Sequence, residues 1–365
     1  MPSFELTEEQ QQIQDMTRKF AAGEMRPLAR DADEAAQLPD GLLDQAWTLG
    51  LVAQAIPEAH GGYGLERSAV TGAIVAEELA WGDLSLALAA LAPMLMTVPL
   101  LEFATEAQQA EWLPKFTGDS PYAATAALTE PRIHFDPFRP ETTVTRRNGS
   151  AILNGVKCAV PLAGDAEHIL VYARRDDTDT VDAVIIDRAG EGVTLEQEAY
   201  MGLRPLPLYR VTLRSAEVSR ERVLGGDTGI DYMRLLNLSR AAWAALSVGV
   251  ARASYEYALK YAKEREAFGE PIACRQSIAF MLAEMAMEID AMRLMAWRTA
   301  WRLDRKEDAT RDATLARNYC AQNVMAITDY GVQILGGHGY IREHPVELWF
   351  RNGRGFANLE GLALV

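Results

Sequence analysis

Two short phrases in the second half of the chain decide the fold: YAKEREAFGEPI at residues 261–272 and QILGGHGY at residues 333–340. The first combines a helix end, an arginine, an aromatic residue and a Gly-Glu-Pro turn. The second is a helix end followed by a glycine turn. Taken singly, each phrase is typical of a simple helix break. The sequence on either side of the two phrases indicates that they connect long helices.

Both phrases lie among helices with a clear apolar stripe. Apolar residues recur at intervals of three and four before and after the first phrase: Leu246, Val250, Ala253, Tyr257 and Tyr261, then Met285, Ile289, Met292 and Ala296. Such spacing places one apolar stripe along a helix. Residues 227–365 are therefore predicted to form a C-terminal four-helix bundle, which we expect to mediate oligomerisation.

The sequence upstream of the bundle changes character twice. Short β-type runs occupy the middle of the chain, at residues 143–145, 168–173, 183–186, 192–195 and 209–213, with Asn148-Gly149 and Asn154-Gly155 as turn dipeptides. We predict a small antiparallel β domain over residues 123–226. Long runs rich in Ala, Leu, Glu and Gln precede it, so residues 1–122 are predicted to form an N-terminal helical domain. The predicted fold is mostly α with a central small β domain.

Charge and composition exclude several classes of protein. The chain of 365 residues has 36 Lys and Arg against 51 Asp and Glu, a formal charge of −15. This balance repels phosphate backbones and anionic lipid surfaces, so we expect neither a nucleic-acid nor a membrane partner. The most apolar stretch, Leu86 to Leu101, is interrupted by Pro93 and Pro99 and is shorter than the roughly 20 residues of a membrane span.

The cysteines, the histidines and the first residues indicate which metal sites, disulfides and cellular compartment to expect. Three cysteines and five histidines show no CxxC or HExxH spacing, which argues against structural zinc and a disulfide framework. The polar, acidic start has no signature of a secretory or transit peptide. A reducing cytoplasm is the expected compartment.

Taken together and in this order, the phrases resemble the acyl-CoA dehydrogenase family. The resemblance covers essentially the whole chain and rests on Pro57 to Leu65, Thr129-Glu130-Pro131, Met201 to Arg204, Arg265 with Phe268-Gly269, Gln276 to Met287, and Gln333 to Tyr340. It implies a flavoprotein in which FAD lies between the β domain and the C-terminal helices, with a neighbouring subunit completing the flavin site. A homo-oligomer, dimer or tetramer, is expected, and a hetero-oligomer is possible.

The resemblance implies an oxidoreductase of lipid metabolism that converts an acyl-CoA thioester to its 2-enoyl-CoA and passes electrons to electron-transferring flavoprotein. The chemistry agrees, because no side chain accepts a hydride and a redox cofactor is needed. The base is best a carboxylate in a desolvated pocket. Glu360 lies in an apolar stretch at the family's catalytic position, nine residues after Arg351. The alternative position for a base is occupied by Ser239, which cannot act as one.

Further roles follow from the resemblance alone. Arg265 would reach across a subunit interface to the FAD pyrophosphate, since a guanidinium forms paired, charge-assisted hydrogen bonds to phosphate. The other expected flavin contacts are Thr129, Phe268, Gln276, Gln333, Gly336 and Gly337. The expected substrate contacts are Asn237, Arg240 and Gly361.

The chain departs from the family's pattern around the flavin. His134 and Phe135 stand where the family has glycine and serine; Ala159 and Pro161 replace a tryptophan and a threonine, and Leu362 a further threonine. The residues that would contact the flavin of a neighbouring subunit (in trans) are retained. Those that would contact the flavin of their own subunit (in cis) are largely lost. Each lost hydrogen bond is worth about 1 to 3 kcal/mol. We therefore expect FAD to be held weakly.

Three functions are compatible with the sequence. The first is an FAD-dependent acyl-CoA dehydrogenase with Glu360 as base. The second is an acyl-CoA-binding enzyme without flavin redox, a lyase, hydratase or decarboxylase. The third is a non-catalytic subunit of a hetero-oligomer that presents Arg265 to a partner's flavin while binding none itself. The visible spectrum of the purified protein separates the first from the other two.

Overall fold

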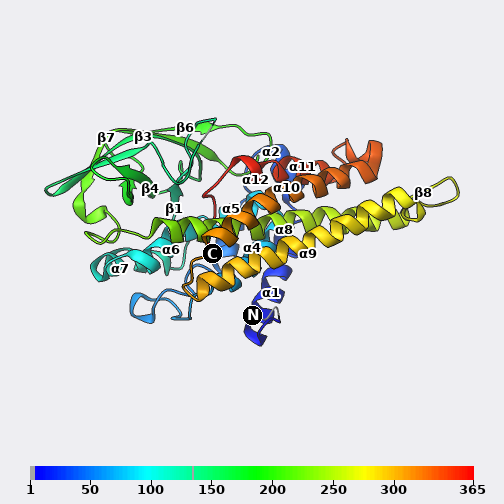
Figure 1. The fold of residues 1–365 in the computed structure, drawn as a ribbon, viewed down its shortest axis with the longest axis horizontal. Helices are drawn as coiled ribbons and strands as arrows, with labels where there is room; N and C mark the ends of the chain where they lie inside the picture. Colours follow the sequence, from blue (N-terminus) through cyan, green and yellow to red (C-terminus); the bar gives the residue numbers. More distant parts are fainter. Residues whose placement is uncertain (1–4, 134) are drawn as a thin grey trace.

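The computed structural model describes residues 5–133 and 135–365, and its parts follow the predicted order of helices, sheet and helices (Figure 1). The N-terminal helices are α1 (Glu8–Phe20), α2 (Ala29–Ala35), α3 (Leu42–Trp47), α4 (Ala69–Gly82), α5 (Leu84–Leu91), α6 (Met94–Phe103) and α7 (Glu106–Trp112). Capping boxes start two of them, with Thr7 and Gln10 at α1 and Thr105 and Gln108 at α7. These reciprocal hydrogen bonds satisfy backbone N–H groups that a helix start leaves free.

Helices α5 and α6 carry the most apolar part of the sequence. They meet at Pro93 and are almost entirely buried. In the described part of the chain, no single helix has the length and apolar character of a membrane span. This pair reaches those values only together, with a bend of 43° between its two members.

The middle of the chain forms a seven-stranded sheet. Its strands are β1 (Ala124–Ala127), β2 (Thr143–Arg147), β3 (Ser150–Pro161), β4 (His168–Arg175), β5 (Val181–Asp187), β6 (Val193–Glu198) and β7 (Leu208–Ser219). The order is β1-β4-β2-β3-β7-β6, with β5 paired to β4. The predicted antiparallel pairing holds for most of the sheet, but β4 pairs in parallel with both β1 and β2.

The dipeptide Asn154-Gly155 is not a turn. It lies inside β3, where the register with β7 shifts between Leu153 and Gly155. A Cβ at Gly155 would stand 2.5 Å from the Thr142 Oγ1 atom, so a glycine is needed for this close approach. Asn148-Gly149 does form the turn between β2 and β3, as predicted.

The C-terminal part consists of three long helices and two short ones. They are α8 (Tyr232–Glu264), α9 (Gln276–Asp304), α10 (Thr310–Leu335), α11 (Val346–Gly353) and α12 (Gly355–Asn358), with a small hairpin, β8 (Glu266–Ala267) and β9 (Glu270–Pro271), between α8 and α9. The predicted stripe on α9 is buried along its whole length. The hairpin lies at the tip of the long helices, at the opposite end of the molecule from the sheet (Figure 1).

Helix α8 is the central helix of the molecule. Its first two thirds are buried on nearly all sides, because α4 packs against it as well as α9 and α10. A buried ion network ties these helices together. Arg252 of α8 binds Glu77 and Glu78 of α4, and Arg293 of α9 also binds Glu77. Burial alone would raise the pKa of Glu78, but hydrogen bonds from Arg252 and Arg18 hold it below the usual glutamate value.

Candidate functional site

Glu360 is the centre of a buried ion cluster where α8 and α10 approach the end of the chain. Its side chain is 5% exposed, and its Oε1 atom accepts a hydrogen bond of 2.7 Å from Arg240 Nε. Arg317 Nε lies 3.5 Å from its Oε2 atom. Arg240 also donates to the Thr314 hydroxyl at 2.9 Å. Thr314 and Arg317 share one face of α10, since they are three residues apart. One carboxylate is therefore held by two guanidinium groups.

The loop that follows β1 covers this cluster. The Thr129 hydroxyl donates to the Glu360 carbonyl at 2.6 Å, and the Tyr232 hydroxyl donates to the Pro137 carbonyl at 2.5 Å. Burial raises the pKa of Tyr232, so its hydroxyl stays a donor. The Phe138 ring lies 4.8 Å from the Arg240 guanidinium. The Glu360 carboxylate is thus bound by arginines, and its backbone carbonyl is bound by a residue of the β domain.

The expected substrate residues lie in the same place and already have partners within the chain. The Asn237 amide nitrogen donates to the Thr310 hydroxyl at 3.1 Å, and within the described residues its buried Oδ1 atom has no partner. Gly361 has φ of +77°, and a Cβ there would stand 2.5 Å from Leu128 Cδ2. The structure therefore brings Asn237, Arg240, Glu360 and Gly361 together, with Leu128 packed directly on the chain.

Two of the residues expected at the flavin ring, Ala159 and Leu362, lie in a closed wall. We define the closed wall as Leu128, Ala159, Leu203 and Leu362, which come from four separate segments and belong to one hydrophobic core. Their side chains are between 1% and 3% exposed. In a structure without ligands, residues that line a ring-sized slot would keep exposed surface. The closed wall keeps almost none, although a cavity of about 620 Å³ lies beside Leu203 and is lined also by Glu198, Tyr200, Leu206 and Arg351.

The backbone behind the closed wall is also occupied. Ala159 has φ of +52°, and its N–H donates to the Glu198 carboxylate at 3.1 Å. Glu198 accepts a further hydrogen bond from Tyr200 and pairs with Arg210. Burial raises the pKa of the neighbouring Cys158 thiol to about 11, so this thiol is not a nucleophile at neutral pH. Ala159, which stands where the resemblance places a tryptophan, is thus buried, with its N–H bound to Glu198.

Two further departures are Phe135, on the loop after β1, and Pro161, the last residue of β3. Phe135 is half-buried and packs against the main hydrophobic core, and Pro161 is buried. His134 lies outside the described residues. The sequence led us to expect weak flavin binding through lost hydrogen bonds. At two of the substituted positions, Ala159 and Leu362, the side chain is also buried in the hydrophobic core.

The residues expected to contact a neighbouring subunit's flavin lie elsewhere, on what we call the far-end surface. It consists of Arg265, Phe268, Gln276, Gln333, Gly336 and Gly337. Arg265 ends α8 and is exposed, and among the residues that the structure describes its guanidinium has no hydrogen-bond or ion-pair partner. Phe268 is 97% exposed with φ of +56°, and the Arg275 guanidinium lies 5.7 Å from its ring. Gln276, the first residue of α9, is exposed beside them.

The glycine turn after α10 belongs to the same surface. The Tyr261 hydroxyl is 2.7 Å from His338 Nδ1, which places the turn beside the last helical residues before Arg265. Gln333, Gly336 and Gly337 are exposed. A Cβ at either glycine would meet no atom of the described chain within 4 Å. The backbone of the turn is therefore open to an approaching ligand.

One chain cannot bring the residues around Glu360 and the residues of the far-end surface to the same ligand ring. Arg240 and Arg265 are 25 residues apart on the same straight helix, α8 and its end, which corresponds to about 38 Å at 1.5 Å per residue. Thr129, the one expected cofactor residue on the β domain, lies at the Glu360 end. Three of the others, Arg265, Phe268 and Gln276, belong to or adjoin the β8–β9 hairpin at the tip of the long helices (Figure 1), and the remaining three, Gln333, Gly336 and Gly337, lie at the end of α10.

Sequence reasoning missed Arg317, Thr314, Phe138, Tyr232 and Glu198. A spacing signal existed for α10, because Thr310, Thr314 and Arg317 are four and three residues apart and share a face. No signal predicted the reach of Glu198 to Ala159. Across residues 5–133 and 135–365, no group of three or more His, Cys, Asp or Glu side chains could hold a metal ion.

Comparison with known proteins identifies the relatives of this architecture. Models for the N-terminal, middle and C-terminal domains of acyl-CoA dehydrogenases match residues 7–119, 125–216 and 227–363. The chain is 31% identical over 360 residues to the short-chain specific acyl-CoA dehydrogenase of rat mitochondria, covering 96% of this chain and 86% of the relative. It is 33% identical to a probable acyl-CoA dehydrogenase of Bacillus subtilis, covering 96% and 94%.

The solved structures agree. Butyryl-CoA dehydrogenase from Megasphaera elsdenii superposes with a TM-score of 0.88 at 28% identity, over 97% of this chain and 95% of that one. This match confirms the predicted architecture of helical, β and helical parts. The chain therefore belongs to the acyl-CoA dehydrogenase family of enzymes.

Proposed function

We propose that this chain works in the α,β-dehydrogenation of an acyl-CoA thioester as a subunit that completes a flavin site carried by a neighbouring chain. Proteins of its family are flavoproteins, usually with FAD. The observation that supports the proposal is the far-end surface, where Arg265 and Phe268 are exposed. Arg265 lies about 38 Å along α8 from Arg240, the residue that binds Glu360. Residues placed there are positioned to serve a ligand outside their own chain.

The chemistry of the far-end surface suits a dinucleotide. An unpaired guanidinium forms paired hydrogen bonds to phosphate oxygens, and Arg265 is such a group. An exposed aromatic ring such as Phe268 offers a planar face to a planar ligand. Gly336 and Gly337 let a ligand approach the backbone closely. The flavin supplies the hydride acceptor, and this chain's residues hold its phosphate and adenosine half.

The role of Glu360 as a base stays a prediction. Its position beside Asn237 and Arg240 favours that role, because the resemblance places substrate there. Its contacts favour a structural role, since Arg240 and Arg317 occupy both carboxylate oxygens. No observation favours the flavin-free lyase, hydratase or decarboxylase reactions. Electron-transferring flavoprotein as acceptor and the cytoplasm as compartment are likewise proposals that follow from resemblance and composition.

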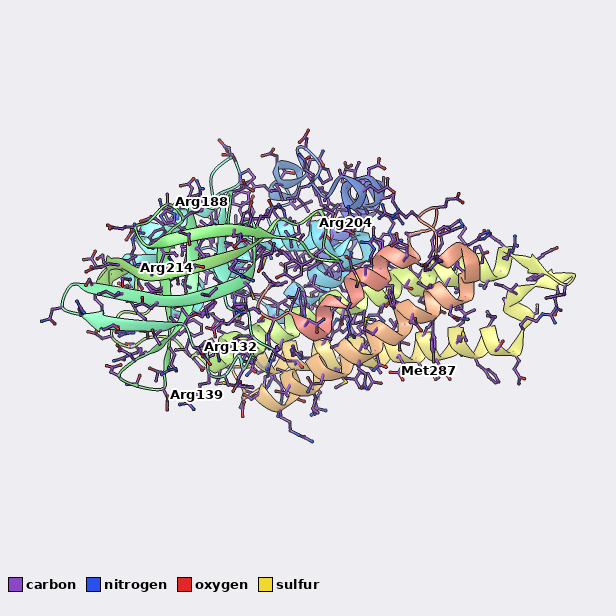
Figure 2. All side chains as sticks on the ribbon, turned by 90° about the horizontal axis from the view of Figure 1, so that it is seen from above. Arg132, Arg139, Arg188, Arg204, Arg214 and Met287 are labelled. Carbon is purple, nitrogen blue, oxygen red and sulfur yellow. The ribbon has the colours of Figure 1, made fainter. Side chains whose placement is uncertain are left out.

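The proposal is tested by replacing Arg265 in the assembled oligomer. Hydrogen bonds to a charged group contribute about 1.5 to 3 kcal/mol, so Arg265→Ala is expected to weaken FAD binding by about 10- to 100-fold. Arg188→Ala is the matched control, because Arg188 is an exposed arginine on the β domain, far from the hairpin (Figure 2). Unchanged FAD affinity in Arg265→Ala and in Phe268→Ala would rule the proposal out.

A further inference from the structure

We propose that a cavity between the N-terminal helices and the β domain is a second ligand site, which takes a single aromatic ring that carries an amine or a hydroxyl group. This site goes beyond the proposed function, because its lining shares no residue with the Glu360 cluster or the far-end surface. The cavity has a volume of about 110 Å³. An engineered apolar cavity of about 150 Å³ in another protein binds benzene, so one ring without large substituents matches the space.

The walls of the cavity come from two separate parts of the fold. Leu43 and Trp47 of α3 and Ala89 and Ala90 of α5 form the helical side. Tyr122, which lies just before β1, is part of the β-domain side. The lining is predominantly apolar, as is typical of sites for small molecules. A ligand held there would touch the N-terminal helices and the β domain at once.

Two aromatic side chains of the lining are fixed at their polar ends. Trp47 Nε1 donates to the Gly118 carbonyl at 2.8 Å. The Tyr122 hydroxyl lies 2.5 Å from His168 Nδ1, and His168 Nε2 lies 3.0 Å from Asp187 Oδ1. Because both polar groups are already paired, Trp47 and Tyr122 offer a ligand their rings rather than new hydrogen bonds.

The contacts behind Tyr122 keep the cavity open. The Phe116 ring packs edge-to-face on Tyr122 with 5.1 Å between the ring centroids, and Trp112 packs in the same way on His168 at 4.7 Å. Tyr122 cannot turn into the cavity without losing these contacts. An empty apolar space costs stability, because the atoms around it lack van der Waals partners. A ring that fills the cavity would supply the missing contacts.

Asp165 determines which end group the ligand can carry. It is exposed and lines the cavity, so it lies where the cavity meets solvent. Among the described residues of the lining it is the only charged one, and within the described part of the chain its carboxylate has no hydrogen-bond or ion-pair partner. A carboxylate accepts hydrogen bonds and repels anions. The site therefore favours an amine or a hydroxyl group over a carboxylate on the ring.

The test is calorimetric titration of the protein in its native assembly with benzylamine, benzyl alcohol and benzoate. We expect one benzylamine bound per chain, weaker binding of benzyl alcohol and no binding of benzoate. Ala90 is half-buried, so Ala90→Phe should fill the cavity from α5 and abolish binding. Ala107→Phe is the matched control on the exposed face of α7, and it should bind benzylamine like the original protein.

A second variant tests the end group without filling the cavity. Asp165→Asn should weaken benzylamine binding by about two- to fivefold, the value of an exposed charge pair, and leave the affinity for benzyl alcohol unchanged. Absence of binding for all three probes at millimolar concentration would overturn the proposal. Equal affinities for benzylamine in Ala90→Phe and in the original protein would place the ligand elsewhere and overturn it as well. Benzoate binding as tight as benzylamine binding would overturn the role of Asp165.

Discussion

Replacing Glu360 with glutamine separates a structural role from a catalytic one. The carboxylate is 5% exposed, and Arg240, also 5% exposed, donates to it at 2.7 Å. Removing one partner of a buried ion pair costs about 3 to 5 kcal/mol, because the remaining charge is left uncompensated. Glutamine keeps the size and one acceptor oxygen, so we expect a loss of about 3 kcal/mol for Glu360→Gln.

The assay is urea unfolding of the chain produced alone, with the slope of the transition compared between variants. Glu307→Gln is the control, since Glu307 pairs with Arg305 at 2.7 Å through side chains that are 36% and 57% exposed. Such surface pairs contribute about 1 kcal/mol or less. A purely structural role predicts that turnover of Glu360→Gln in the native assembly stays within about twofold of the original protein. General base catalysis would instead predict a fall of about 10²- to 10⁴-fold. That fall, with stability unchanged, would refute the structural role.

Three further outcomes are expected from the chain produced alone. Gly361→Ala should lower the free energy of unfolding by more than about 2 kcal/mol, because its Cβ would strike Leu128; Leu128→Ala in that background should recover part of the loss, and a purely additive double variant in urea would contradict the closed wall. Burial raises the pKa of Asp83 to about 6. The folded state therefore binds a proton at Asp83 more tightly than the unfolded state does, and the contribution of Asp83 to stability falls as pH rises from about 4 to 6. Asp83→Asn should therefore gain stability relative to the original chain across that window, and a flat difference between the two denaturation curves would argue against it. Phe138→Ala should cost about 1 kcal/mol, the value of a partly exposed contact between Arg240 and an aromatic ring, with an unaltered urea midpoint as the contrary result.

The long-range architecture was predictable because it rests on periodicity. Apolar stripes on the C-terminal helices are set by local spacing, and the long helices form where the stripes predict them. Strand β1 was missed because Ala124–Ala127 contains only alanine and threonine, and its pairing with β4 is decided by tertiary contacts. The glycine in β3 was read as a turn because close approach to Thr142 cannot be seen in a linear sequence.

The candidate site was predictable in its parts but not in its arrangement. The sequence singled out Glu360 and Arg240, and the structure places them in contact. Arg317 reads as an ordinary surface arginine until α10 is placed beside the chain end. The substitutions at Ala159 and Leu362 were visible as lost hydrogen bonds. The closure also depends on Leu128 and Leu203, which in a sequence look like any core leucine.

The ratio of FAD to chains in the intact native assembly tests the central claim most directly. Native mass spectrometry of the complex purified through a tag on this chain reports the chain masses and the bound flavin together. The account predicts that the assembly carries FAD and that Arg265→Ala in this chain lowers the FAD content while the chain masses and numbers stay the same. An Arg265→Ala assembly with an unchanged ratio of FAD to chains would contradict it.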